Sequence, residues 1–106
     1  MALEVNKDNY ESEVLQANGL VLVDVWGPRC IPCMSLMPFV DTLQDKYPNL
    51  KVVKLDSSQN RRLCINHRII ALPTFILYQD GQEIERLSGD GVSPESITAM
   101  IEKAYA

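Results

Sequence analysis

The stretch DVWGPRCIPC, residues 24 to 33, carries the clearest chemical pattern in this chain. It continues an apolar run, LVLVDVW at 20–26, and it ends in two cysteines separated by Ile31 and Pro32. Two cysteines at this spacing can carry a catalytic disulfide, hold a metal ion, or simply fill a core. The elements on either side of them narrow the choice.

The apolar run at 20–26 is rich in β-branched residues, a pattern typical of a strand buried on both faces. After the cysteines, a helix is predicted from Cys33 to Tyr47, because Leu36, Met37, Val40 and Leu43 recur on one helical face. The sequence KVVKLD at 51–56 predicts a second strand. A strand that leads directly into a helix therefore places the cysteine pair at the turn between them.

The remaining segments continue this alternation. Helices are predicted at 8–17, at about 60–68, and after the cap Ser93-Pro94-Glu95, and a hairpin is predicted from 74–79 and 82–88 around Asp80-Gly81. A short strand is placed at Leu3 to Val5. This order predicts an α/β fold with a central mixed β-sheet flanked by helices on both faces.

Composition limits the class of protein. A chain of 106 residues with 46% hydrophobic residues predicts one domain, residues 1–106. With 10 Lys and Arg against 14 Asp and Glu, the net charge is −4, so nucleic acid and anionic membranes are not expected partners. The start MALEVNKDNY has no basic segment followed by an apolar run, and we expect a cytoplasmic monomer.

The position of the two cysteines predicts different tasks for them. Cys30 is placed at the N-terminal edge of the predicted helix, where free backbone N–H groups and the helix dipole favour a thiolate, which is the nucleophile in disulfide exchange. Cys33 lies about one turn inside the helix, close enough to form the disulfide but shielded from substrate, as a resolving thiol would be.

A zinc site is the alternative interpretation. The chain has three cysteines, and Cys64 with His67 repeats the spacing of Cys30 with Cys33. Together these four residues are plausible zinc ligands. The spacing alone leaves this alternative open.

Three polar or aromatic residues near the cysteine pair are further candidates. Asp24 lies within the apolar run and has no obvious solvent-exposed face, so its pKa should be raised, which makes it a good proton acceptor. Lys54 is either its partner or a solvated lysine at the end of a strand. Trp26 is expected in the core, where its ring can also form a wall of the active-site loop.

Several separated motifs, in one order, resemble the thioredoxin family. They are Asp24 two residues before Trp26, the C-I-P-C sequence, Pro38 in the following helix, Lys54 in VVKLD, Pro73 in ALPTF, and Gly89 after the last strand. The resemblance covers essentially the whole chain, and this set is far more specific than C-x-x-C alone. It implies the thioredoxin fold.

The resemblance also implies a function. The chain would reduce protein disulfides: Cys30 attacks, and Cys33 releases the reduced substrate with Asp24 accepting its proton. Pro73 would be cis and would turn the backbone of Leu72 toward a substrate strand. No cofactor is expected, and a separate flavoprotein, thioredoxin reductase, would supply electrons. In this register Cys64 is a buried, inert thiol, and no metal is expected.

The chain departs from the family pattern beside the nucleophile. Arg29 stands where the family has a tryptophan, and Ile31 replaces a glycine. A charged and a branched side chain at these positions would change partner recognition, so a dedicated reductase is one hypothesis. Two other functions remain: an oxidase or isomerase using the same cysteines, and a non-catalytic binding module. Pro32 before the second cysteine favours a reductase, by the family pattern.

Overall fold

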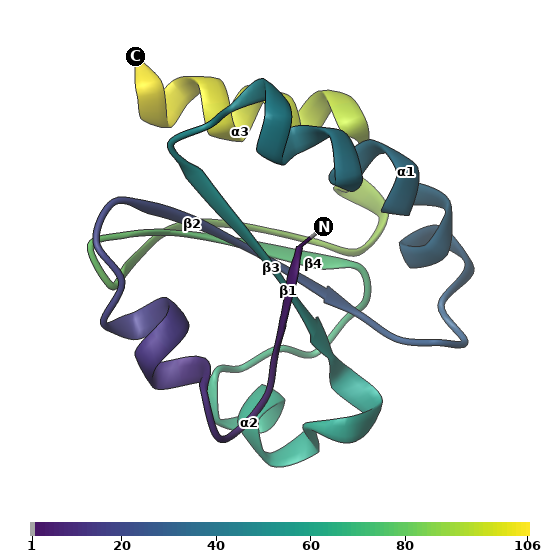
Figure 1. Ribbon diagram of the computed structural model, residues 1–106. Helices are drawn as coiled ribbons and strands as arrows, with labels where there is room; N and C mark the ends of the chain where they lie inside the picture. The colour runs from purple at the N-terminus through teal and green to yellow at the C-terminus, as the bar shows by residue number, and fades with distance from the viewer. Residues whose placement is uncertain (1) are drawn as a thin grey trace.

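The computed structural model describes residues 2–106, and it is built on one five-stranded mixed sheet (Figure 1). The strand order is β1-β3-β2-β4-β5. Strands β1, β2 and β3 run parallel to one another, β4 pairs antiparallel with β2, and β5 pairs antiparallel with β4. The strands span Leu3–Val5 (β1), Leu20–Trp26 (β2), Leu50–Asp56 (β3), Thr74–Gln79 (β4) and Gln82–Ser88 (β5). The strand that leads to the cysteine pair, β2, is therefore central.

Helices cover both faces of the sheet, as predicted (Figure 1). The helices are α1 (Ile31–Lys46), α2 (Arg61–Asn66) and α3 (Pro94–Tyr105), with short helical turns at Glu11–Leu15 (η1), Ser57–Gln59 (η2) and Gly89–Gly91 (η3). Helices α1 and α3 lie on one face, and α2 and η1 lie on the other. None of the helices that residues 2–106 form is long and apolar enough to cross a membrane.

The alternation of side chains along β2 divides the core into two layers. Leu20 and Leu22 pack with α1 and α3, whereas Val21, Val23 and Val25 pack with η1 and α2. Because successive side chains of a strand point to opposite faces, Asp24 faces the α1 side. The first turn of α1, which holds Cys33, covers the same side of the sheet.

The hairpin between β4 and β5 forms where the sequence predicts it. Its central residues, Asp80 and Gly81, have φ values of 50° and 82°, as a tight hairpin turn with two left-handed residues requires. A Cβ on Gly81 would lie 2.1 Å from the carbonyl oxygen of Leu15, so only glycine fits there. The hairpin turn therefore packs directly against the end of η1.

Two predicted helices are shorter than expected. The segment 8–17 forms a helical turn with π geometry over Glu11–Leu15, and α2 ends at Asn66 instead of near Arg68. Arg68 has a φ of 57°, and the backbone N–H of Ile69 donates to the carbonyl of Cys64 at 2.9 Å. This is the left-handed cap that usually takes glycine, and it turns the chain toward the loop before β4.

Candidate active site

The loop after β2 places Cys30 at the start of α1. Gly27, Pro28 and Arg29 link the strand to the helix, and Cys30 is the N-cap residue, with extended backbone angles. Its Sγ accepts a hydrogen bond from the backbone N–H of Cys33 at 3.2 Å. The helix thus begins two residues earlier than predicted, and the sulfur of Cys30 occupies the capping position that a serine or aspartate oxygen would normally take.

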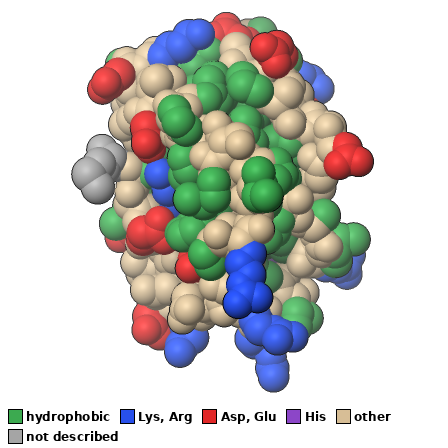
Figure 2. Space-filling model, turned by 90° about the vertical axis from the view of Figure 1, so that its right-hand side faces the viewer, with side chains coloured by type: hydrophobic (Ala, Val, Ile, Leu, Met, Phe, Trp, Pro, Cys, Tyr) green, Lys and Arg blue, Asp and Glu red, His purple; other side chains and the backbone are tan. Residues whose placement is uncertain are grey.

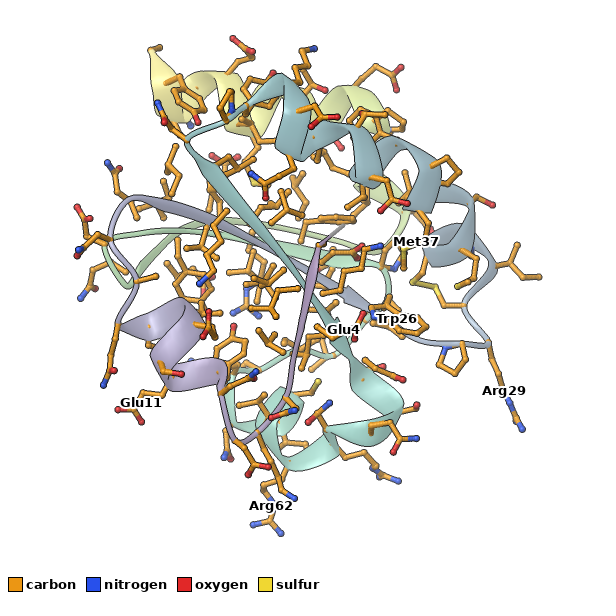
Figure 3. All side chains as sticks on the ribbon, viewed as in Figure 1. Glu4, Glu11, Trp26, Arg29, Met37 and Arg62 are labelled. Carbon is orange, nitrogen blue, oxygen red and sulfur yellow. A yellow bond between two sulfur atoms is a disulfide. The ribbon has the colours of Figure 1, made fainter. Side chains whose placement is uncertain are left out.

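Cys30 and Cys33 form a disulfide, with Cα atoms 5.2 Å apart (Figure 3). Cys30 is partly exposed, whereas only 1% of the surface of Cys33 is exposed. Cys33 lies with Leu36 and Val40 on the inner side of α1. Only the first sulfur is therefore open to another protein.

Asp24 is buried in the middle of the sheet, with only 1% of its surface exposed. Its Oδ2 atom has no hydrogen-bond partner among residues 2–106. Burial raises the pKa of Asp24 to about 7, the positive charge of Lys54 opposes this shift, and the charges of Glu4 and Asp41 add to it. A carboxyl group with this pKa can accept or release a proton at neutral pH.

Lys54 is adjacent to Asp24 in the parallel register of β2 and β3. Its ammonium group, however, forms an ion pair with Asp41 Oδ1 of α1 at 2.9 Å, and no hydrogen bond or ion pair joins it to Asp24 in the part of the chain that the structure describes. Lys54 therefore acts on Asp24 through space. The sequence analysis did not consider Asp41; its position one turn after Pro38 on α1 gave no distinguishing signal.

Trp26 ends β2 and is only partly buried (Figure 3). Its indole Nε1 is buried and has no hydrogen-bond partner within residues 2–106. The ring lies on the α1 side of the sheet, next in alternation to Asp24. Trp26 belongs to neither core layer, so its predicted place in the core is only partly met, and its role as a wall of the active-site loop stays a prediction.

The Leu72–Pro73 peptide bond is cis, as the family resemblance implied. The Pro73 carbonyl accepts a hydrogen bond from the Gly89 N–H at 2.8 Å, and Gly89 has a φ of 70°, which glycine adopts without strain. Neither the N–H nor the carbonyl of Leu72 is hydrogen-bonded to any residue from 2 to 106. The backbone of Leu72 is thus free to pair with another chain.

A surface cavity of about 350 Å³ lies beside the nucleophile. It is bordered by residues 27–30 of the active-site loop, by Ser57 and Ser58 of η2, and by Leu72. A Cβ on Gly27 would lie 3.1 Å from Leu72 Cδ1, so a larger residue here would push on the Leu72 side chain that borders the cavity. The sequence analysis missed Ser57 and Ser58, since only the fold brings η2 next to Cys30.

Apolar side chains gather at the centre of the face shown in Figure 2, and several residues close to Cys30 in the sequence or near the Leu72 loop are exposed hydrophobics. Ile31 is 79% exposed and Ile70 is 94% exposed, and Met34 is also exposed. Arg29 extends away from the body of the protein (Figure 3). The two departures from the family pattern, Arg29 and Ile31, are therefore both on the surface that a partner would meet.

The zinc alternative can be compared with this geometry. Cys64 is buried on α2, and burial raises the pKa of its thiol. His67 lies against the ring of Tyr10, with ring centroids 4.9 Å apart, and burial lowers its pKa. No group of three or more His, Cys, Asp or Glu side chains in residues 2–106 is arranged to hold a metal ion.

Comparisons with known proteins identify the family of this chain. A thioredoxin family model matches residues 1–103. The chain is 44% identical over 105 residues to a thioredoxin of Peptoclostridium acidaminophilum, covering 97% of this chain and 94% of that protein. It is 40% identical over 101 residues to a thioredoxin of Acetoanaerobium sticklandii, covering 94% and 96%. The chain therefore belongs to the thioredoxin family of thiol–disulfide oxidoreductases.

Proposed function

We propose that this protein reduces disulfide bonds of other proteins, with Cys30 as the nucleophile and Cys33 as the resolving thiol. The observation that carries the proposal is the contrast between the two sulfurs: Cys30 Sγ is partly exposed and accepts a backbone N–H at 3.2 Å, whereas Cys33 is buried. A hydrogen-bond donor at the helix N-terminus stabilises a thiolate at Cys30.

The reaction is an exchange of disulfides in two steps. The Cys30 thiolate attacks one sulfur of the substrate disulfide, which forms a mixed disulfide and releases the other substrate sulfur as a thiolate. The Cys33 thiol then loses its proton and attacks Cys30 Sγ. This step breaks the mixed disulfide, releases the second substrate thiolate, and leaves the protein oxidised by two electrons.

Asp24 is proposed as the acceptor of the Cys33 proton. Both residues are buried on the same side of the sheet, and Asp24 Oδ2 has no hydrogen-bond partner among residues 2–106, so this oxygen is available to accept a proton. Because burial raises its pKa to about 7, Asp24 is partly ionised at neutral pH and can take up the proton reversibly.

Substrate binding is assigned to the backbone of Leu72, beside Pro73. A substrate strand that pairs with Leu72 would run past Cys30 and the cavity of about 350 Å³ next to it. Main-chain pairing gives little selectivity for side chains, so we expect many protein substrates. Trp26, Pro32 and Gly89 support this region by packing and backbone geometry, and Lys54 contributes by its charge.

The remaining features of the function follow the family pattern. We propose that residues 1–106 act as one domain and as a monomer, without a bound cofactor or metal. The protein would work in the cytoplasm and contribute to redox homeostasis there. A flavoprotein thioredoxin reductase would return two electrons to the Cys30–Cys33 disulfide. A reduction potential near −270 mV would support a reductant, whereas one near −120 mV would indicate an oxidant.

The function is tested by serine substitutions in an insulin-type disulfide reduction assay. Cys30→Ser should abolish reduction, and Cys33→Ser should accumulate a mixed disulfide, because attack still occurs and resolution does not. Cys64→Ser is the matched control and should keep normal turnover. Full turnover by either active-site variant would reject the two-cysteine mechanism.

Arg29 and Ile31 suggest a dedicated reductase. The pair Arg29→Trp and Ile31→Gly restores the family residues on this surface, so turnover with a conventional thioredoxin reductase should rise. Turnover that is already high in the unaltered protein, and that does not rise in the double variant, would exclude the idea.

A further inference from the structure

Four positive side chains near the redox site are not used by the fold for ion pairs. In the structure of residues 2–106, Lys51, Lys54, Arg86 and Lys103 each form an ion pair with a carboxylate, whereas the other six Lys and Arg residues form none. Two of these six are Lys46 and Arg68, and the four that border a cavity at Cys30 or at the start of α2 are Lys7, Arg29, Arg61 and Arg62. All four are exposed. Although the chain has a net charge of −4, four unpaired positive side chains therefore border two cavities of its surface.

Three of these side chains line one cavity. Lys7, Arg61 and Arg62 border a cavity of about 350 Å³ at the start of α2. The backbone N–H of Lys7 donates to Asn60 Oδ1 at 3.0 Å, and Asn60 Nδ2 donates to the Asp56 carbonyl at 2.9 Å. Asn60 is buried, so these bonds hold the loop of Lys7 against the start of α2. The clustering of charge is therefore built into the fold.

The same positive side chains are continuous with the redox site. The three residues of η2 separate two cavities: Ser57 and Ser58 border the cavity of Cys30 and Arg29, and Gln59 borders the cavity of Arg61 and Arg62. Figure 2 shows the apolar surface at the centre of this face, with a group of Lys and Arg side chains below it, further Lys and Arg side chains at the top and side edges, and Asp and Glu side chains mainly to its left and above. We call Lys7, Arg29, Arg61 and Arg62 the basic edge.

Local acids and helix stability do not account for the basic edge. The Asp56 carboxylate accepts hydrogen bonds from the backbone N–H and the hydroxyl of Ser58, and Asp8 is an exposed residue that forms no ion pair with any residue from 2 to 106. Arg61 and Arg62 occupy the first turn of α2, where acidic residues would be the stabilising choice. The charges of the two arginines are therefore unfavourable for the helix dipole at this end of α2.

We propose that the basic edge binds an acidic segment of the partner protein whose disulfide reacts at Cys30. This inference rests on the proposed function and adds a class of partner to it. A small anion would meet only one of the two cavities, whereas an extended polypeptide rises about 3.3 Å per residue and can pass Arg29, cross η2 and reach Arg61 and Arg62. Rim charges of this kind mainly raise the association rate.

The test uses cyclic disulfide peptides flanked on both sides by four Glu or by four Gln residues. Reduced protein is mixed with each peptide, and single-turnover reduction is followed at low ionic strength and at about 0.3 M salt, where charges are screened beyond several ångströms. We expect the Glu peptide to react about 10-fold faster at low salt, and this advantage to disappear at high salt.

Charge reversal identifies the residues responsible. The double variant Arg61→Glu and Arg62→Glu should lower the rate for the Glu peptide about 10-fold and leave the Gln peptide within about 2-fold. The control variant, Lys46→Glu and Lys103→Glu, changes the net charge equally; Lys46 ends α1, about 22 Å along the helix from Ile31. An equal loss in the control, or no loss in the Arg61 and Arg62 variant, would overturn the inference.

A binding measurement separates this inference from the proposed function. The Glu peptide with both cysteines replaced by serine should bind the oxidised protein, and the Arg61 and Arg62 reversals should remove this binding. If the unaltered protein fails to reduce the Gln peptide, the proposed function fails, while the binding assay still tests the basic edge. Tighter binding of inorganic pyrophosphate than of the serine peptide would overturn the inference in favour of a small-anion site.

Discussion

Lys54 lies opposite Asp24 on the neighbouring parallel strand, yet its ammonium group bonds to Asp41 at 2.9 Å. Asp24 consequently keeps one carboxylate oxygen without a hydrogen bond, and burial dominates its titration. A direct ion pair with Lys54 would have favoured the charged form and lowered the pKa of Asp24. The arrangement instead leaves a buried carboxyl group that titrates near neutral pH.

Asp24→Asn should slow release of substrate from the mixed disulfide without slowing its formation. The pKa of Asp24 is about 7, so in the unaltered protein the release rate should rise as pH increases through 7. The asparagine variant should lack this rise, and the two proteins should converge at low pH, where Asp24 is protonated. Single-turnover release between pH 5 and 9 measures this. Identical pH profiles would remove Asp24 from the mechanism.

The same substitution should stabilise the fold at neutral pH. Because the folded pKa of Asp24 is raised from 3.8 to about 7, the folded protein keeps a proton that the unfolded chain releases between these values. The free energy of unfolding of the unaltered protein should therefore fall as pH rises from 4 to 7. The advantage of Asp24→Asn should grow over this range and reach up to about 4 kcal/mol at pH 8.

Urea unfolding at pH 4 and pH 8 checks this stability prediction. The difference between the two proteins should be small at pH 4 and large at pH 8. Val23→Ala is a useful control, because a cavity in the other core layer destabilises the protein by a similar amount at both pH values. A constant difference between Asp24→Asn and the unaltered protein would show that Asp24 titrates at its ordinary pKa.

Lys54 and Asp41 should shift the titration of Asp24 in opposite directions. Lys54 lowers the pKa of Asp24 and Asp41 raises it, so Lys54→Met should move the midpoint of substrate release to higher pH and Asp41→Asn should move it to lower pH. The ion pair between them is lost in both variants. Equal shifts in the same direction would mean that the ion pair, and not the charge of each residue, sets the midpoint.

The sequence was sufficient to predict the elements that depend on local patterns. The central strand at 20–26, the hairpin at Asp80-Gly81 and the cap at Ser93 each combine a hydrophobic period with a residue that suits one backbone geometry. The cysteine pair was placed correctly at the strand-to-helix turn for the same reason. The start of α1 was placed two residues too late, because Cys30 caps the helix through its sulfur.

Contacts between distant segments could not be predicted. The hydroxyl groups of Tyr10 and Tyr78 are hydrogen-bonded at 2.8 Å across 68 residues, and Ser57 reaches the cavity of Cys30 only because η2 follows β3. The ion pair of Lys54 with Asp41 also depends on how α1 lies over the sheet. In each case the residue type was visible, but its partner was determined by tertiary packing.

Arg68→Gly should stabilise the protein by about 1 kcal/mol. Arg68 has a φ of 57°, which places its Cβ close to the following carbonyl, whereas glycine adopts this conformation freely. The side chain is exposed and forms no ion pair within residues 2–106, so little is lost when it is removed. The hydrogen bond that Arg86 Nη1 donates to the Arg68 backbone carbonyl, at 3.1 Å, is kept.

Arg68→Ala is the matched control, because alanine removes the same charge but keeps the Cβ. The urea midpoint of unfolding should be higher for the glycine variant than for the unaltered protein, and it should not rise for the alanine variant. Disulfide reduction should be unchanged in both, since Arg68 lies outside the cavity of Cys30. An equal gain from alanine would assign the effect to the charge of Arg68 and would contradict the backbone explanation.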